Sequence, residues 1–177
     1  MPLFPICFII NRCLGESITI SVRTKFGFRY RLGIMPDQAL SHLTVIEFCS
    51  LVSGPYCTKL LADFGAEVIK IEPPGIGDCA RRRGPFLHDI PSHELSGLFL
   101  HLNTNKLGIT LDVTTETGKS ILKELTKKAD IFIEDNPPAV MGKQGLTYND
   151  LEALNPRLVM TSITPFGQTM PYRDYKA

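Results

Sequence analysis

The sequence predicts an α/β protein whose core is a Rossmann-like, doubly wound parallel sheet. Two observations lead to this prediction. From Leu43 onward, short apolar segments rich in β-branched residues alternate with longer segments in which apolar residues recur at helical spacing. Glycine, proline and helix-capping residues stand at the junctions between the two kinds of segment. Repeated strand–helix–strand units with right-handed crossovers give a parallel sheet covered by helices.

The first β-α-β unit is expected over residues 43–71. Residues 43–48 are apolar and β-branched, as a buried parallel strand should be. Pro55 suits the first turn of the following helix, where its missing N–H is not needed, and Gly65 suits the helix end. Residues 67–71 form the second expected strand.

A long connection follows, and then the alternation resumes. Residues 72–105 are rich in Pro, Gly and Arg, which predicts a largely irregular segment with one short helix near 93–100. Later strands are expected at 108–112, 131–133 and 158–163. The intervening helices are expected to begin at 114–117 with an apolar face of Ile121, Leu122 and Leu125, to end at Gly145 after 139–144, and to run over 148–154 after a Thr147 cap.

In such a sheet, ligands bind at the carboxyl ends of the strands, where the strand order reverses. We therefore expect the chemistry of this protein to lie on the loops that follow the strands. These loops are 49–54, 72–78, 112–115, 134–138 and 164–169.

The composition of the 177-residue chain narrows the function classes. A net charge of +1 predicts neither a nucleic-acid partner nor binding to a membrane surface. The longest apolar run, residues 3–10, is far shorter than the roughly 20 residues that cross a bilayer. Five scattered cysteines without a C-x-x-C pair predict a reducing compartment, the cytoplasm or alternatively the mitochondrial matrix. The four histidines lack metal-site spacing, so no metal is expected.

The first 34 residues differ from the rest of the chain. They carry five basic residues and one acidic residue, a net +4, whereas the remaining residues carry 14 basic and 17 acidic residues, a net −3. Such a segment is either a targeting sequence or an extension upstream of a natural start at Met35; its apolar stretch comes too early for a signal peptide. We favour the extension and leave residues 1–40 without a fold assignment.

Several local motifs are weak on their own. The G-x-G at Gly75 and Gly77 lacks the third glycine and the helix start of a dinucleotide site, and the chain has no P-loop. Arg81-Arg82-Arg83 is either a solvated turn or a phosphate clamp. Cys49 and Cys57 flank a helix N-terminus, and we interpret both as packing residues.

Taken together, five ordered motifs resemble the N-terminal portion of family III CoA-transferases, the group of formyl-CoA transferase, carnitine CoA-transferase and the acyl-CoA racemases. The resemblance covers residues 43–177 and leaves 1–40 without a counterpart. It implies a CoA-binding Rossmann-like domain over 41–177, an incomplete part of a larger fold that forms interlocked homodimers at full length. The motifs are V-S-G-P-Y-C (52–57), L-A-D-F-G-A-E-V-I-K-I-E-P-P-G (61–75), G-D (77–78), N-T-N-K (103–106) and F-G-Q (166–168).

The resemblance also implies which positions hold CoA. These are Val52, Ser53, Pro73, Leu111, Asp112, Val113, Thr114, Asp135, Asn136, Pro137, Lys143 and Lys176. Four of them depart from the family pattern. Pro73 replaces an arginine, Val52 replaces an active-site glutamine of formyl-CoA transferase, and Asp135-Asn136 replaces an asparagine–aromatic pair. The positive charge lost at Pro73 could come from the Arg81–Arg83 cluster. Because Val52 lacks the glutamine side chain, the resemblance does not imply an oxalate-type substrate.

The family reaction moves CoA from an acyl-CoA to a carboxylic acid acceptor through an aspartyl-CoA thioester. The resemblance places the nucleophilic aspartate downstream of the matched region, and Asp174 is not expected to replace it. We therefore expect no catalytic residue in this chain and no activity by itself. Two alternatives stay open: an acyl-CoA racemase of the same superfamily, and a non-catalytic CoA-binding protein.

Overall fold

The computed structural model describes residues 38–169, 171–173 and 175. The expected extension at 1–40 therefore lies almost wholly outside the described residues, and Asp174 and Lys176 lie outside them as well. The fold below is that of the compact unit formed by residues 39–177.

Five parallel strands form one sheet in the order β3-β2-β1-β4-β5. This arrangement confirms the predicted doubly wound α/β class. The order reverses between β1 and β4, where Phe48 of β1 pairs in register with Glu134 of β4. The strands are β1 (Thr44–Phe48), β2 (Glu67–Glu72), β3 (Leu107–Thr110), β4 (Ile131–Glu134) and β5 (Val159–Ser162).

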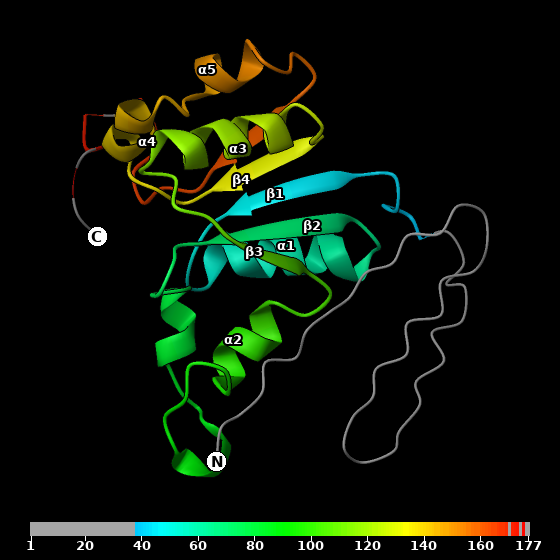
Figure 1. Cartoon of the computed structure of the whole chain (residues 1–177), viewed down its shortest axis with the longest axis vertical. Helices are drawn as coiled ribbons and strands as arrows, with labels where there is room; N and C mark the ends of the chain where they lie inside the picture. Colours follow the sequence, from blue (N-terminus) through cyan, green and yellow to red (C-terminus); the bar gives the residue numbers. More distant parts are fainter. Residues whose placement is uncertain (1–37, 170, 174, 176–177) are drawn as a thin grey trace. The chain divides into compact units, whose positions relative to one another are not determined.

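Helices cover both faces of the sheet (Figure 1). Helix α1 (Ser53–Asp63) packs on one face, and α3 (Glu116–Thr126), α4 (Pro138–Gln144) and α5 (Tyr148–Glu152) lie on the other. Strand alternation sends successive side chains to opposite faces, which produces two separate cores. One core contains Ile46, Ile71, Leu122, Phe132 and Leu151, and the other contains Val45, Ala62, Val68 and Ile133.

Local signals set the helix boundaries on the second face. The Thr115 side chain accepts the Gly118 N–H and begins α3. Gly145, at φ 63°, ends α4 in the left-handed conformation that glycine tolerates. Thr147 begins α5 with a reciprocal capping box to Asp150, which confirms the predicted cap.

The long connection contains three short elements, η1 (Cys79–Arg82), η2 (Leu87–Asp89) and α2 (Gly97–Leu102). The helix expected near 93–100 thus begins later. Ser96 decides this start, because its buried hydroxyl accepts the Phe99 N–H at 3.2 Å. The same hydroxyl oxygen lies 2.7 Å from the carbonyl oxygen of Ala80, so it also joins α2 to η1.

Candidate functional site at the carboxyl ends of the strands

Two loops meet where the strand order reverses, one after β1 and one after β4. The Ser50 N–H donates to Asp135 Oδ2 at 2.9 Å, and the Asn136 side-chain amide donates to the Phe48 carbonyl at 3.2 Å. These bonds join segments more than 80 residues apart in the sequence. Doubly wound sheets bind their ligands at this position, and we call the region between the two loops the crevice.

The loop after β1 turns sharply before α1 begins. Leu51 has φ 69°, in the left-handed region that a leucine rarely adopts. Its N–H donates to Asp78 Oδ1 at 2.9 Å. Just beyond, a Cβ on Gly54 would lie 2.3 Å from the Cβ and Sγ atoms of Cys49, so only glycine lets α1 start this close to β1.

A buried ion network lies under this loop, on the α1 face of the sheet. Lys70 Nζ lies 2.7 Å from Glu47 Oε1 and 2.7 Å from Asp78 Oδ2, and it donates to the Cys49 carbonyl at 3.0 Å. Lys106 Nζ lies 2.8 Å from Glu47 Oε2. The exposed fraction of each charged side chain is 2% or less, and the two cations balance the two anions.

Burial and ion pairing shift the pKa values of Lys70 and Lys106 in opposite directions. Burial alone lowers the pKa of Lys70, but Glu47 and Asp78 together raise it above its ordinary value. Burial lowers the pKa of Lys106, and its single carboxylate partner, Glu47, does not fully offset this. Lys70 therefore stays charged, as its two buried carboxylate partners require.

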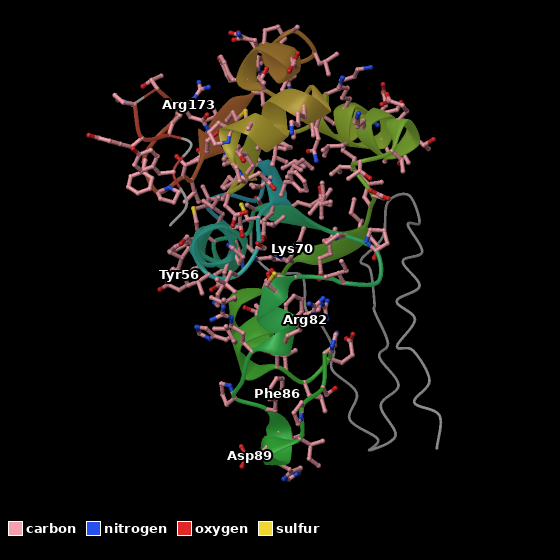
Figure 2. The ribbon with its side chains drawn as sticks, turned by 90° about the vertical axis from the view of Figure 1, so that its left-hand side faces the viewer. Tyr56, Lys70, Arg82, Phe86, Asp89 and Arg173 are labelled. Carbon is pink, nitrogen blue, oxygen red and sulfur yellow. The ribbon has the colours of Figure 1, made fainter. Side chains whose placement is uncertain are left out.

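A further ion pair, between Arg81 and Glu72, joins η1 to β2; Figure 2 labels Arg82 of η1 and Lys70 of β2. Arg81 donates from Nε and Nη2 to the two oxygens of Glu72, at 2.7 and 2.8 Å, and its guanidinium lies 3.7 Å above the Phe99 ring. Arg81 is therefore not a free phosphate ligand. Arg82 and Arg83 are exposed and remain candidates for that role.

One carboxyl group at the crevice, that of Asp135, is a weaker acid than an ordinary aspartate. Burial raises the pKa of Asp135 to about 6; the Ser50 N–H and Lys70 oppose this shift, and nearby acidic groups add to it. Burial and Asp135 also raise the pKa of the Cys49 thiol, which agrees with the packing interpretation of that cysteine. The same interpretation of Cys57 is wrong, because Cys57 is exposed on α1.

The structure brings one group of the expected CoA contacts together at the reversal of strand order. Val52 and Ser53 are exposed at the start of α1, and Asp135, Asn136 and Pro137 follow β4 into α4. The loop hydrogen bonds described above connect the two sets. Lys143 is exposed in the last turn of α4, and Lys176 lies outside the described residues.

The remaining expected contacts lie beside β2 and β3. Pro73 is exposed directly after β2, and the Leu111 N–H donates to the Glu72 carbonyl at 2.9 Å, which places the two loops side by side. The Asp112 side chain accepts from the N–H and the hydroxyl of Thr114. The Val113 side chain is buried in the core, so this residue can offer a ligand only its backbone.

Sequence reasoning missed Glu47, Lys70, Asp78 and Lys106 as a group. A signal for two of them was present, because Glu47 and Lys70 are charged residues inside otherwise apolar strands. Asn103 belongs to the same network, since its side-chain oxygen accepts from Lys106 Nζ at 2.9 Å. The G-D and N-T-N-K motifs thus supply parts of one buried cluster.

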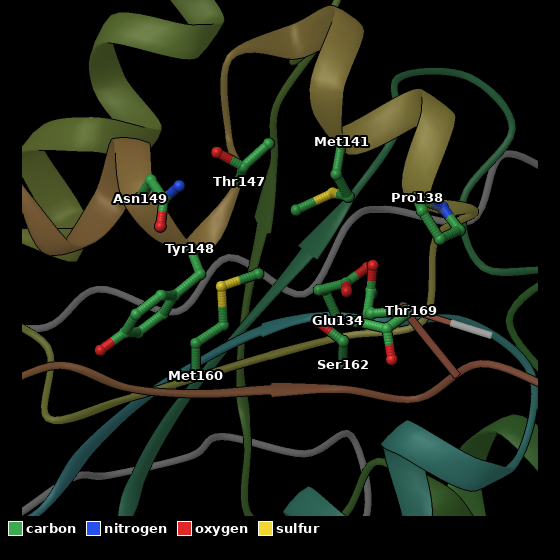
Figure 3. Close-up of a pocket in the computed structure, with 10 residues that line it drawn as sticks. Glu134, Pro138, Met141, Thr147, Tyr148, Asn149, Met160, Ser162 and Thr169 are labelled. Carbon is green, nitrogen blue, oxygen red and sulfur yellow. The ribbon is translucent and has the colours of Figure 1, made fainter. Parts of the chain in front are cut away.

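A pocket of about 390 Å³ lies on the other face of the sheet, beside α4 and α5 (Figure 3). Met141, Tyr148, Met160 and Ser162 line it together with Glu134. Within the described part of the chain, Glu134 Oε1 has no hydrogen-bond partner, and burial raises the pKa of this carboxyl group. The expected CoA contacts are not among the residues that line this pocket.

Within the described residues, neither a metal-binding cluster nor a membrane-spanning helix is found. Residues 38–169, 171–173 and 175 hold no group of three or more His, Cys, Asp or Glu side chains placed to bind a metal ion. None of the helices in this part of the chain is long and apolar enough to cross a membrane.

Known proteins match most of the chain. The family model for CoA-transferase family III matches residues 40–177. A formyl-CoA:oxalate CoA-transferase from Bradyrhizobium sp. (strain ORS 278) is 43% identical over 139 residues, covering 78% of this chain and 32% of the relative. A succinyl-CoA–D-citramalate CoA-transferase from Chloroflexus aurantiacus is 42% identical over 142 residues, covering 78% and 34%. The chain spans about a third of the length of these curated relatives.

Solved structures agree with this match. A CaiB/BaiF family protein from Brucella suis superposes with a TM-score of 0.71 at 36% identity, covering 79% of this chain and 37% of the other. The Mycobacterium tuberculosis protein Rv3272 gives 0.73 at 36% identity, covering 81% and 39%. The resemblance drawn from the motifs, and the partial coverage of a larger fold that it implied, are confirmed.

Proposed function

The chain belongs to CoA-transferase family III, and from this premise we propose that residues 40–177 bind the CoA part of an acyl-CoA in the crevice after β1 and β4. The observation that carries the proposal is the meeting of the two loops where the strand order reverses, joined by the Ser50–Asp135 hydrogen bond. Both loops lie inside the matched region, and both contain positions that the family resemblance assigns to CoA.

The full reaction is the transfer of CoA between carboxylic acids. One relative is named for formyl-CoA and oxalate and another for succinyl-CoA and D-citramalate, so an acyl-CoA donor and a carboxylic acid acceptor form the substrate class. Because this chain spans about a third of those relatives, the reaction is proposed for the whole protein. The part described here supplies the CoA site.

The proposed chemistry is covalent. An aspartate carboxylate attacks the acyl-CoA carbonyl and releases CoA thiolate, leaving a mixed anhydride; the thiolate then attacks the aspartyl carbonyl and releases the donor acid. The acceptor carboxylate next displaces thiolate from the aspartyl thioester, and the thiolate attacks the acceptor's acyl carbon to restore the aspartate. Asp78 pairs with Lys70 and accepts the Leu51 N–H, and Asp135 accepts the Ser50 N–H, so we give both a structural role and assign the attack to an aspartate elsewhere in the whole protein.

The surroundings of the crevice fit a ligand with an apolar arm and an anionic end. Val52 and Pro73 expose apolar surface, and Lys143, Arg82 and Arg83 are exposed cations that can meet phosphate groups. The phosphates are therefore expected toward these cations and away from Asp135.

CoA binding by this chain tests the proposal. We expect isothermal titration with CoA to detect binding and expect Ser53→Trp, which fills the crevice from an exposed position, to weaken it by at least about tenfold. Ser120→Trp is the matched control, because Ser120 is an exposed serine of α3 away from the expected contacts. A chain that does not bind CoA, or equal affinities for Ser53→Trp and the unaltered chain, would contradict the proposal.

A further inference from the structure

Asp78 is a buried residue whose two carboxylate oxygens have different partners. Oδ1 accepts the Leu51 N–H at 2.9 Å and the Ala80 N–H at 2.7 Å. Oδ2 lies 2.7 Å from Lys70 Nζ. One side chain thus connects the loop after β1, the start of η1 and the buried ammonium of β2.

The loop after β1 needs such a connection. Leu51 is held at φ 69°, and a branched side chain in this left-handed region is unfavourable unless neighbouring contacts impose it. At the Leu51 end of the turn, the Asp78 carboxylate accepts the Leu51 N–H and so favours this conformation. At the other end, Lys70 donates to the Cys49 carbonyl at 3.0 Å. The turn therefore has a bond at each end, and both bonds depend on the Lys70–Asp78 pair.

We propose that Asp78 is a positioning residue for CoA, which acts by holding Leu51 in its left-handed conformation. That conformation sets the direction in which the chain enters α1, and so it places the exposed residues Val52 and Ser53 at the crevice. Asp78 itself is 2% exposed and does not touch the ligand. The inference rests on the proposed function, because Val52 and Ser53 are CoA contacts only if the crevice binds CoA.

The Leu51→Gly variant distinguishes the positioning role of Asp78 from a general effect of Asp78 on folding. Glycine adopts positive φ without strain, so Leu51→Gly lowers the turn's need for the Asp78 hydrogen bond. Asp78→Ala removes both the bond to Leu51 and the pairing with Lys70, whereas Asp78→Asn keeps an acceptor oxygen for the N–H and removes only the charge.

Asp130→Ala is the matched control. Asp130 Oδ2 accepts the Thr44 N–H at 2.9 Å, so Asp130 is also an aspartate bonded to a backbone amide, but at the opposite end of β1 from Leu51. Thermal unfolding and far-UV circular dichroism of each variant identify those that fold. If Asp78→Ala does not fold, Asp78→Leu, which fills the same space without an acceptor oxygen for the Leu51 N–H, takes its place in every comparison.

The experiment measures CoA affinity by titration in four chains: unaltered, Asp78→Ala, Leu51→Gly and the double variant. We expect Asp78→Ala to weaken CoA binding by about tenfold in the Leu51 background and by less than about threefold in the Leu51→Gly background. Asp130→Ala should leave CoA affinity unchanged. Equal losses in the two backgrounds would overturn the inference. So would a folded variant without the Asp78 acceptor oxygen that binds CoA as tightly as the unaltered chain.

Hydrogen exchange distinguishes a failure of this inference from a failure of the proposed function. If the unaltered chain does not bind CoA, the CoA proposal fails, while exchange at the Leu51 amide still reports on the turn. A Leu51 amide that is protected in the unaltered chain and exchanges at least about tenfold faster in Asp78→Ala supports the hold on Leu51. An exchange rate that Asp78→Ala leaves unchanged contradicts it.

Discussion

The Asp135 carboxylate accepts the Ser50 N–H at 2.9 Å and thereby joins the two loops of the crevice. Burial raises the pKa of this carboxyl group to about 6, so its charge changes within the pH range of ordinary biochemical experiments. The family resemblance places an asparagine at this position, which accepts the same hydrogen bond without ionising. The aspartate thus adds a pH dependence that an asparagine lacks.

Asp135→Asn is expected to change how stability depends on pH. A carboxyl group whose pKa is raised on folding stabilises the protein below its ordinary pKa near 3.8, and this contribution is lost as the pH rises through about 6. Relative to Asp135→Asn, the unaltered chain should therefore lose about 1–3 kcal/mol of unfolding free energy between pH 4 and pH 7. Urea unfolding at both pH values measures this difference, and parallel pH profiles for the two chains would contradict the prediction.

Lys70→Met should be strongly destabilising. Lys70 pairs with Glu47 and Asp78, and its loss leaves Asp78 without a cation in a site that water does not reach. Removing one partner of a buried ion pair costs about 3–5 kcal/mol of unfolding free energy. Lys128→Met, at an exposed position after α3, is the control and should change stability by less than about 0.5 kcal/mol. A Lys70→Met chain within about 1 kcal/mol of the unaltered one would show that the network relaxes or admits water.

Most of the fold could be predicted because its signals are local. Thr147 and Gly145 mark helix ends within a few residues of their partners, and the strands differ from prediction by only one or two residues at most ends. The third strand ends earlier than expected, at Thr110. There the Asp112 side chain bonds forward to Thr114 and turns the chain toward α3.

The ion network could not be predicted, because its partners are distant in sequence. Strand alternation places Glu47 and Lys70 on one face of the sheet, but nothing local shows that Asp78 returns to them from an irregular segment. The Leu51–Asp78 bond spans 27 residues and ends on a residue whose left-handed backbone no sequence pattern indicates. Residues outside regular elements carry no periodicity from which their direction can be read.

Gly54→Ala should destabilise the protein, whereas Gly142→Ala should not. A methyl group on Gly54 would lie 2.3 Å from the side chain of Cys49, so α1 or β1 would have to shift, at a cost of about 1–3 kcal/mol. Gly142 lies within α4 with open space around its Cβ position, so alanine there should add up to about 1 kcal/mol of helix stability. Chemical denaturation of the pair tests the prediction, and similar effects at the two positions would contradict it.

Arg81→Lys should be destabilising although it conserves the charge. Arg81 makes two parallel hydrogen bonds to Glu72, and its guanidinium lies over the Phe99 ring. A lysine ammonium can neither make this two-bond contact nor stack as a flat group on the ring. The side chain is only partly buried, so we expect a loss of about 1–2 kcal/mol. Arg83→Lys, at an exposed position of the same cluster, is the control and should be neutral in thermal unfolding.

Glu134→Gln should stabilise the protein at pH 8 and have little effect at pH 4. Burial raises the pKa of Glu134, so folding must keep an ionised group buried at high pH but a neutral one at low pH. One carboxylate oxygen accepts the Asn136 N–H at 2.8 Å, a bond that glutamine can also make, and the other has no hydrogen-bond partner among the described residues. Replacing that charged oxygen with an amide should therefore add about 1 kcal/mol to the unfolding free energy at pH 8. Urea unfolding of both chains at the two pH values measures it, and a Glu134→Gln chain that is less stable at pH 8 would show that the ionised carboxylate has a favourable partner in the pocket.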